Sequence, residues 1–170
     1  GVKVEAEGSM TNGVLIAKKI QIKSNGVRIE GVAETPLANG SFTILGITVK
    51  VVTETDNELG AFSAGTSMKI EGSKSGARQI TASKISSASG GGGSRTELRG
   101  PLDANPSGSS FVILGVSVST GGSTVFQDLS GASITSATFF ANTKANDIVK
   151  ARGTENPDNQ ISATEVENED

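Results

Sequence analysis

Residues 41–49 read SFTILGITV, and the same pattern returns 69 positions later as SFVILGVSV at residues 110–118. Both copies alternate apolar and polar residues with a period of two, which indicates strands with one buried face. Phe42 and Ile44 share one face, and the alternation changes phase around Gly46. A glycine at such a phase change predicts a bulge or a sharp bend, as found where the sheet of a small barrel turns a corner.

Two further blocks extend the repeat. One ends in glycine each time and occurs as VEAEG (4–8), MKIEG (68–72) and VKARG (149–153). The other follows after a turn, as LIAKKI (15–20), ITASKI (80–85) and ISATEV (161–166). Self-similarity of this kind indicates repeated modules. We therefore expect complete modules at 27–85 and 96–167, and residues 1–24 correspond to the last third of a further module.

Turn sequences separate the blocks, and the clearest are Asn12-Gly13 and Asn39-Gly40. Asn-Gly favours a tight hairpin because both residues tolerate positive φ. Asn39 also begins a glycosylation sequon, but the hairpin alone explains both residues. The first module is expected to hold five strands, at about 27–34, 41–45, 47–53, 66–72 and 79–85.

Five short strands with an insertion after the third are typical of a Greek-key barrel of the OB type. The sequence thus predicts an all-β chain of tandem five-stranded OB-like barrels with an extra N-terminal β-hairpin. The insertion at 55–65 is expected to be a short helix or a loop. The longer one at 120–147 carries Phe126, Phe139 and Phe140, which we expect to cap the barrel or the contact between modules.

Residues 86–95 are a Gly/Ser-rich linker that includes SGGGGS at 89–94. Segments of this composition behave as flexible coils. The modules are therefore predicted to move independently unless an interface joins them.

Composition excludes several kinds of chemistry. The 170 residues include no His, Cys, Trp or Tyr, so Ser-His-Asp and Cys-His catalysis, disulfides and the usual zinc or haem sites are ruled out. The sequence has no phosphate-binding loop, Ser-x-x-Lys or Gly-x-Ser-x-Gly motif. We predict a protein that is not an enzyme and has no cofactor.

Nucleic acid and membrane spans are not expected either. Fifteen basic against eighteen acidic residues leave no clustered positive face, and Phe42 and Phe111 alternate with core residues and so point inward. No apolar run approaches the length of a membrane helix. Glu54, Asp56 and Glu58 form a weak candidate cation site, because their oxygens suit Ca²⁺, and solvent-facing turn residues are the favoured interpretation.

The blocks resemble a bacterial family of small β-barrel modules classed as a domain of unknown function. The shared patterns are V-x-x-E-G-x-V, S-F-x-V-x-G-x-x-V, and V-x-V-E-G followed by x-x-A-x-x-I. They fall here at residues 27–32, 41–49, 68–72 and 82–85. The second module departs from the pattern at Pro101 and in its long loop. The resemblance implies an extracellular or cell-surface setting, an export signal absent from this chain, and no catalytic residues.

Residues 1–24 are informative because an isolated two-stranded hairpin is marginally stable in water. Its missing strands belong either to an upstream part of a longer parent or to another molecule. Packing on the first module or strand addition would use Val2, Val4, Ile20 and Ile22. The favoured function is a non-enzymatic structural repeat protein at the cell surface that self-assembles, with itself or another surface protein as partner. The alternative is an OB-like module that binds a glycan or a protein.

Overall fold

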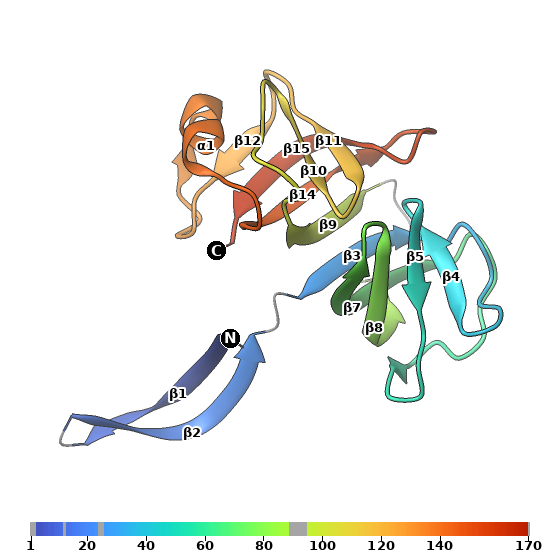
Figure 1. Cartoon of the computed structure of the whole chain (residues 1–170), viewed down its shortest axis with the longest axis horizontal. Helices are drawn as coiled ribbons and strands as arrows, with labels where there is room; N and C mark the ends of the chain where they lie inside the picture. The colour runs from blue at the N-terminus through green and yellow to red at the C-terminus, as the bar shows by residue number, and fades with distance from the viewer. Residues whose placement is uncertain (1–2, 12, 24–25, 89–94, 170) are drawn as a thin grey trace.

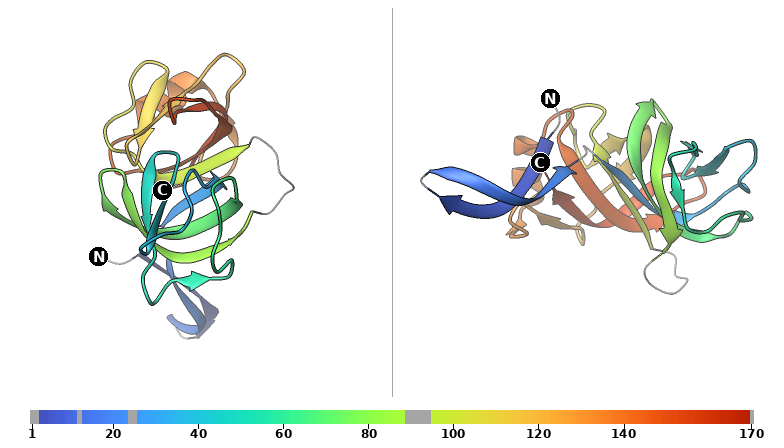
Figure 2. Two further views of the ribbon diagram at one scale, coloured as in Figure 1. Left: turned by 90° about the vertical axis from the view of Figure 1, so that its right-hand side faces the viewer. Right: turned by 90° about the horizontal axis from the view of Figure 1, so that it is seen from below.

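The computed structural model describes residues 3–11, 13–23, 26–88 and 95–169, and side chains in parts of the N-terminal hairpin are outside this description (Figure 1). The described regular elements are strands, apart from one short helix, α1 (Ser136–Asn142). Two barrels lie side by side, and the hairpin projects away from them (Figures 1 and 2). No helix among the described residues has the length and apolar character of a membrane span.

Module 1 is a closed five-stranded barrel with one small additional strand. Around the barrel the order is β3–β7–β8–β5–β4, with β5 parallel to β8 and the other neighbours antiparallel. The barrel closes where the Glu34 N–H donates to the Thr43 carbonyl at 2.8 Å. This order defines the OB-type Greek-key barrel. Its strands are β3 (Val27–Val32), β4 (Ser41–Ile44), β5 (Ile47–Lys50), β6 (Asp56–Asn57), β7 (Ser67–Gly76) and β8 (Gln79–Ser87).

Module 2 repeats the arrangement as β9–β14–β15–β11–β10 and closes where the Asp103 N–H donates to the Val112 carbonyl at 3.0 Å. Its strands are β9 (Thr96–Pro101), β10 (Ser110–Ile113), β11 (Val116–Ser119), β14 (Ile148–Glu155) and β15 (Ile161–Asn168). The predicted fold class is therefore confirmed. Pro101 causes no register slip, because it ends β9 opposite Ile148.

The insertions differ between the modules. Residues 55–65 form a loop that contains β6 rather than a helix. Residues 120–147 contain β12 (Val125–Gln127), β13 (Ser133–Ile134) and α1. The rings of Phe126 and Phe139 are buried and lie 5.2 Å apart, and Phe139 is 5.8 Å from Phe111. These aromatic residues cap the interior of module 2, one of the two places expected for them.

The phase change around Gly46 is a two-residue hairpin turn rather than a bulge. Leu45 and Gly46 have φ of +54° and +64°, the combination of a type I′ turn, and β4 and β5 run antiparallel on either side. Leucine rarely adopts positive φ. Here its side chain is fully buried, and the Gly46 N–H donates to the Glu34 carboxylate at 3.0 Å. Leu114-Gly115 repeats the turn in module 2.

The glycine that ends the repeated EG or RG block has a structural role. Gly8, Gly72 and Gly153 each sit at a register shift of their hairpin. A Cβ atom at these positions would lie 2.0, 2.3 and 2.0 Å from a carbonyl oxygen of the neighbouring strand. The hairpin of β1 (Lys3–Thr11) and β2 (Val14–Lys23) therefore has the bulge of the fourth and fifth strands of a complete module.

The two modules are joined by an interface, which is the condition under which independent motion was not expected. β3 pairs antiparallel with β9 over Arg28–Arg99, Ile29–Leu98 and Glu30–Glu97, so one sheet runs through both barrels. The linker is also shorter than predicted, because β8 continues to Ser87. Composition could not reveal this contact because strand pairing depends on partners distant in the sequence.

Candidate interaction surface at the module junction

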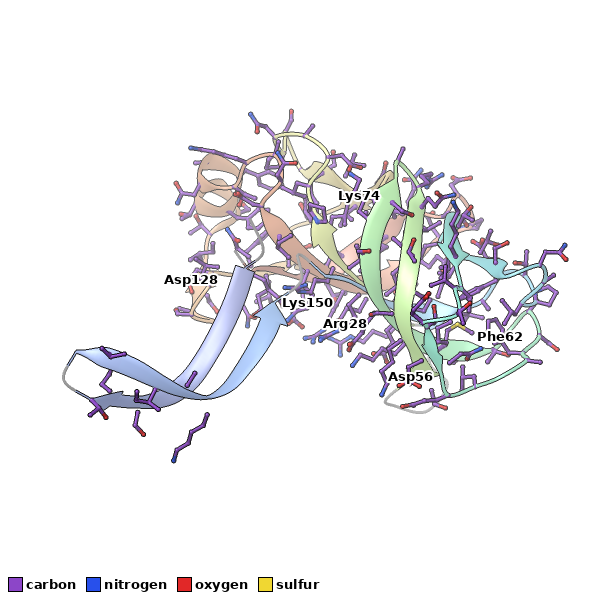
Figure 3. All side chains as sticks on the ribbon, turned by 60° about the horizontal axis from the view of Figure 1, so that its bottom comes forward. Arg28, Asp56, Phe62, Lys74, Asp128 and Lys150 are labelled. Atoms are coloured by element: carbon purple, nitrogen blue, oxygen red, sulfur yellow. The ribbon has the colours of Figure 1, made fainter. Side chains whose placement is uncertain are left out.

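Charged side chains cover the outer face of the sheet where the modules meet. Ile29 and Leu98 are fully buried in their barrels. Because successive strand residues point to opposite faces, Arg28, Glu30 and Glu97 lie on the outer side. Figure 3 shows Arg28 and Lys150 near the boundary between the two modules.

The strand registers arrange these side chains in two rows across six strands. The first row is Lys84, Glu71, Arg28, Arg99, Lys150 and Glu167. The second row is Ser86, Lys69, Glu30, Glu97, Arg152 and Glu165. The residues that alternate with these side chains along each strand point into the barrels, so one alternating pattern supplies both the core and this charged face.

At the junction the two rows place like charges directly opposite each other. Arg28 pairs with Arg99, and Glu30 pairs with Glu97. Directly opposed like charges destabilise a pair of strands. Arg28 is compensated from the side, with its guanidinium 3.8 Å from Glu71 and 3.9 Å from Glu97, yet its Nε is buried without a hydrogen-bond partner. The Arg28–Glu97 contact crosses the junction, and so does a hydrogen bond from Arg99 Nη1 to the Gly26 carbonyl. The junction is therefore held by its backbone pairing, its core and these contacts, against the like charges that face each other directly.

Arg152 bridges the two acidic side chains beside it. Its Nε donates to Glu97 at 2.7 Å, and its Nη1 donates to Glu165 at 2.9 Å. The hydrogen bond to Glu97 is the main reason that the pKa of Arg152 is raised, with burial acting in the opposite direction. Glu97 is 9% exposed, whereas the Arg152 side chain is 31% exposed, so only the acidic partner is shielded from solvent.

Lys150, which is buried, and Glu169, which is partly buried, form a second pair. Burial lowers the pKa of Lys150, but its bonds to Glu167 and Glu169 outweigh this effect and raise it. Burial raises the pKa of Glu169, but its bonds from Arg99 and Lys150 outweigh this effect and lower it. Both groups are thus stabilised in the charged form by their ion-pair partners.

A cavity of about 300 Å³ lies over the junction and is lined by Glu30, Arg95, Glu97 and Arg152. Arg95 donates to Glu165 at 3.2 Å, and its side chain is 65% exposed. Two acids and two bases line the cavity, and both guanidinium groups have carboxylate partners within the protein.

The modules are related by an approximate two-fold arrangement centred on the Ile29–Leu98 pair. Asp103 holds in module 2 the position of Glu34 in module 1, and its carboxylate accepts the Gly115 N–H at 2.6 Å. Lys74 forms an ion pair with Asp103 at 2.6 Å. At the equivalent contact on the other side, Glu155 takes the place of Lys74 and faces Glu34. The Glu155 pKa is raised, mainly by burial and to a smaller extent by the negative charge of Glu34. One half of the junction is thus attractive and the other repulsive.

The sequence matches the family described as Domain of unknown function (DUF5666) twice, over residues 28–86 and 99–167. The chain belongs to the DUF5666 family. No curated protein matches the sequence. Two solved structures of the single-stranded DNA binding protein from Thermus aquaticus, a deletion mutant and the wild type, align with 84% of this chain and 93% and 91% of their own. Identities are 12% and 13% and the TM-score is 0.30, so this likeness carries no functional argument.

The candidate Ca²⁺ ligands lie in the first DUF5666 module, where a lysine contacts two of them. Lys84 lies 2.6 Å from Glu58 and 3.7 Å from Asp56. Glu54 is exposed in the same loop. Within the part of the chain that the structure describes, no three potential ligand side chains form a group that could hold a metal ion.

The predicted assembly residues fall on the hairpin that precedes the DUF5666 modules. The backbone register pairs Val4 with Ile22 and Ala6 with Ile20. Val2, and the side chains of Val4, Ile20 and Ile22, lie outside the described residues. Their proposed role therefore stays a prediction.

Sequence reasoning missed the charged rows, although a signal for them exists. The DUF5666 blocks carry charges two apart, as in Arg28-x-Glu30, Glu97-x-Arg99 and Lys150-x-Arg152. This spacing predicts one charged face on each strand. It could not show which strands become neighbours across the two modules.

Proposed function

We propose that this chain is a non-enzymatic structural protein whose modules assemble by backbone strand pairing at the bacterial cell surface. The observation that carries the proposal is the hairpin β1–β2. It has the bulge of a module's fourth and fifth strands, and among the described strands its two strands pair only with each other.

The complete modules indicate what the hairpin lacks. Their fourth strand pairs with a first strand, as β7 does with β3, and their fifth pairs in parallel with a third, as β8 does with β5. A first and a third strand would complete a barrel on the hairpin, whether they belong to an upstream part of a longer parent or to another polypeptide, and the second source is the one proposed here. Such addition uses main-chain hydrogen bonds, and head-to-tail repetition of it extends into a filament.

The side chains of the hairpin support this proposal. Position 17 matches Ala82 and Ala163, which are buried in their modules, whereas Ala17 is exposed. A completed barrel would cover the face that carries Ala17 and so remove apolar surface from water.

The test compares the chain with a variant whose hairpin is disrupted in place. Gly8→Val puts a side chain against the Ile16 carbonyl oxygen, and the neighbouring Ser9→Ala is the matched control on an exposed residue. Sedimentation velocity and negative-stain microscopy should show mass growing beyond a dimer as concentration rises for the parent and Ser9→Ala but not for Gly8→Val. Equal mass for all three chains at every concentration would refute the proposal.

Ligand binding is the second candidate, favoured by the cavity of about 300 Å³ over the junction. A glycan or peptide that bridges Arg95 and Glu30 would occupy it. This function predicts a monomer at all concentrations. It also predicts that Arg95→Ala abolishes binding in a glycan or peptide array, with Arg78→Ala as the control on a basic residue that does not line the cavity.

A further inference from the structure

The charge pattern of the junction strands suits pairing between identical modules better than the pairing found within the chain. β3 carries Arg28 and Glu30, and β9 carries Glu97 and Arg99 in the equivalent positions. In the antiparallel register each first position faces the second position of the other strand. Because the order of the charges is reversed between the modules, the intrachain pairing opposes like charges.

Pairing β3 with β3 of a second copy, in the same register, reverses this outcome. Arg28 would then face Glu30 of the second copy, and Glu30 would face its Arg28. Likewise, β9 against β9 of the second copy would set Glu97 opposite Arg99 twice. Opposite charges directly across antiparallel strands stabilise the pair.

A second contact favours module 1 in particular. Lys74 now pairs with Asp103, which holds the position of Glu34. Between two copies of module 1, Lys74 would instead reach Glu34 of the second copy, and this ion pair would form twice. Between two copies of module 2 the same equivalence sets Glu155 against Asp103, as Glu155 now faces Glu34. The charge pairs directly across β3–β3 and β9–β9 therefore carry the preference for exchange.

We propose that two copies of this chain exchange junction strands, with β3 pairing with β3 and β9 with β9 of the second copy. This goes beyond the proposed function because it uses the junction and leaves the hairpin unengaged. Pairing within the chain competes with pairing between chains. Because a short Gly/Ser segment tethers the two modules, each module meets the other at an effective concentration of order millimolar. Charge complementarity is expected to bring the dissociation constant of the exchanged dimer below that value.

Two charge designs separate the two pairings without changing the net charge. Glu30→Arg with Arg99→Glu makes both intrachain pairs attractive, because Arg28 then faces an acid and Glu97 faces a base. The same change makes every pair between identical strands repulsive. Arg28→Glu with Glu97→Arg does the same with different neighbours, which controls for local damage. Lys84→Glu with Glu58→Lys reverses an ion pair away from the junction and is the matched control.

The experiment refolds the full chain from denaturant at high concentration and measures the dimer by sedimentation velocity. We expect both junction designs to reduce the dimer population about tenfold or more, and the Lys84 and Glu58 reversal to leave it unchanged. A dimer that persists in both designs, or a parent chain that stays monomeric near millimolar concentration, would overturn the inference.

Cross-linking identifies the edge that is used. In a mixture of ¹⁴N and ¹⁵N chains, a zero-length carbodiimide should join Lys74 to Asp103 in monomers and Lys74 to Glu34 across isotopes in dimers. A dimer that lacks the Lys74–Glu34 product uses another surface and refutes strand exchange. Introducing Gly8→Val separates the two proposals, because it removes assembly through the hairpin and leaves the Lys74–Glu34 product intact.

Discussion

Replacing Gly153 by alanine tests the explanation of the repeated glycine. The added Cβ would lie 2.0 Å from the carbonyl oxygen of Ser162 and 2.8 Å from the Cα of Ala163. Both contacts are with backbone atoms of a strand that is also paired with β11 and β12, so the neighbour has little freedom to retreat. The methyl group must therefore open the β14–β15 bulge.

Overpacking of this kind costs about 1–3 kcal/mol, and opening a strand pair places Gly153→Ala near the upper end, at about 3 kcal/mol. For a chain of this size each kcal/mol lowers Tm by roughly 2–4 °C. Differential scanning calorimetry should therefore find the variant melting roughly 6–12 °C below the parent. Gly72→Ala, whose Cβ would lie 2.3 Å from the Thr81 carbonyl oxygen, should behave similarly.

Gly121→Ala is the matched control, because its Cβ would meet no atom within 4 Å. Reduced backbone freedom of the unfolded chain should leave this variant unchanged or up to about 1 kcal/mol more stable. If Gly153→Ala has the same Tm as Gly121→Ala, the bulge accommodates a side chain and the steric explanation is wrong.

Four other outcomes are expected. Leu98→Ala, which empties a fully buried site on a junction strand, should cost about 2–5 kcal/mol in denaturant titrations. Lys74→Ala loses a partly exposed ion pair and should lower Tm by roughly 1–3 °C, an effect that 1 M salt removes. Glu155→Gln should raise Tm at pH 7 by roughly 1–3 °C. Because the Glu155 pKa is raised in the folded state, the protonated side chain favours folding, and this stability is lost as the pH rises through the folded pKa. The advantage of Glu155→Gln over the parent should therefore vanish below pH 4.5, the ordinary pKa of the group. Because Lys84 neutralises Asp56 and Glu58, Ca²⁺ should not raise Tm, and a rise that Asp56→Ala abolishes would contradict this.

The features that the sequence predicted correctly are local. The period-two pattern around Phe42 assigns that ring to the interior, where it is buried. Asn39-Gly40 was expected to form a turn, and both residues have positive φ between paired Ala38 and Ser41. At Leu45-Gly46 a bulge or a sharp bend was expected, and the structure has a two-residue hairpin turn. Burial of Leu45 and the hydrogen bond from the Gly46 N–H to Glu34 hold this turn, and neither is visible in the local pattern.

Repetition, the five barrel strands of each module and the positions of most turns followed from the sequence, because each depends on residues close together in the chain, whereas the short strands β6, β12 and β13 did not. The junction did not, since the β3–β9 pairing, the opposition of Arg28 to Arg99 and the contact of Lys74 with Asp103 join residues of different modules. Each strand carries a charged face whichever strand lies beside it. Only the tertiary structure decides which charges meet, because edge pairing depends on how two complete barrels dock.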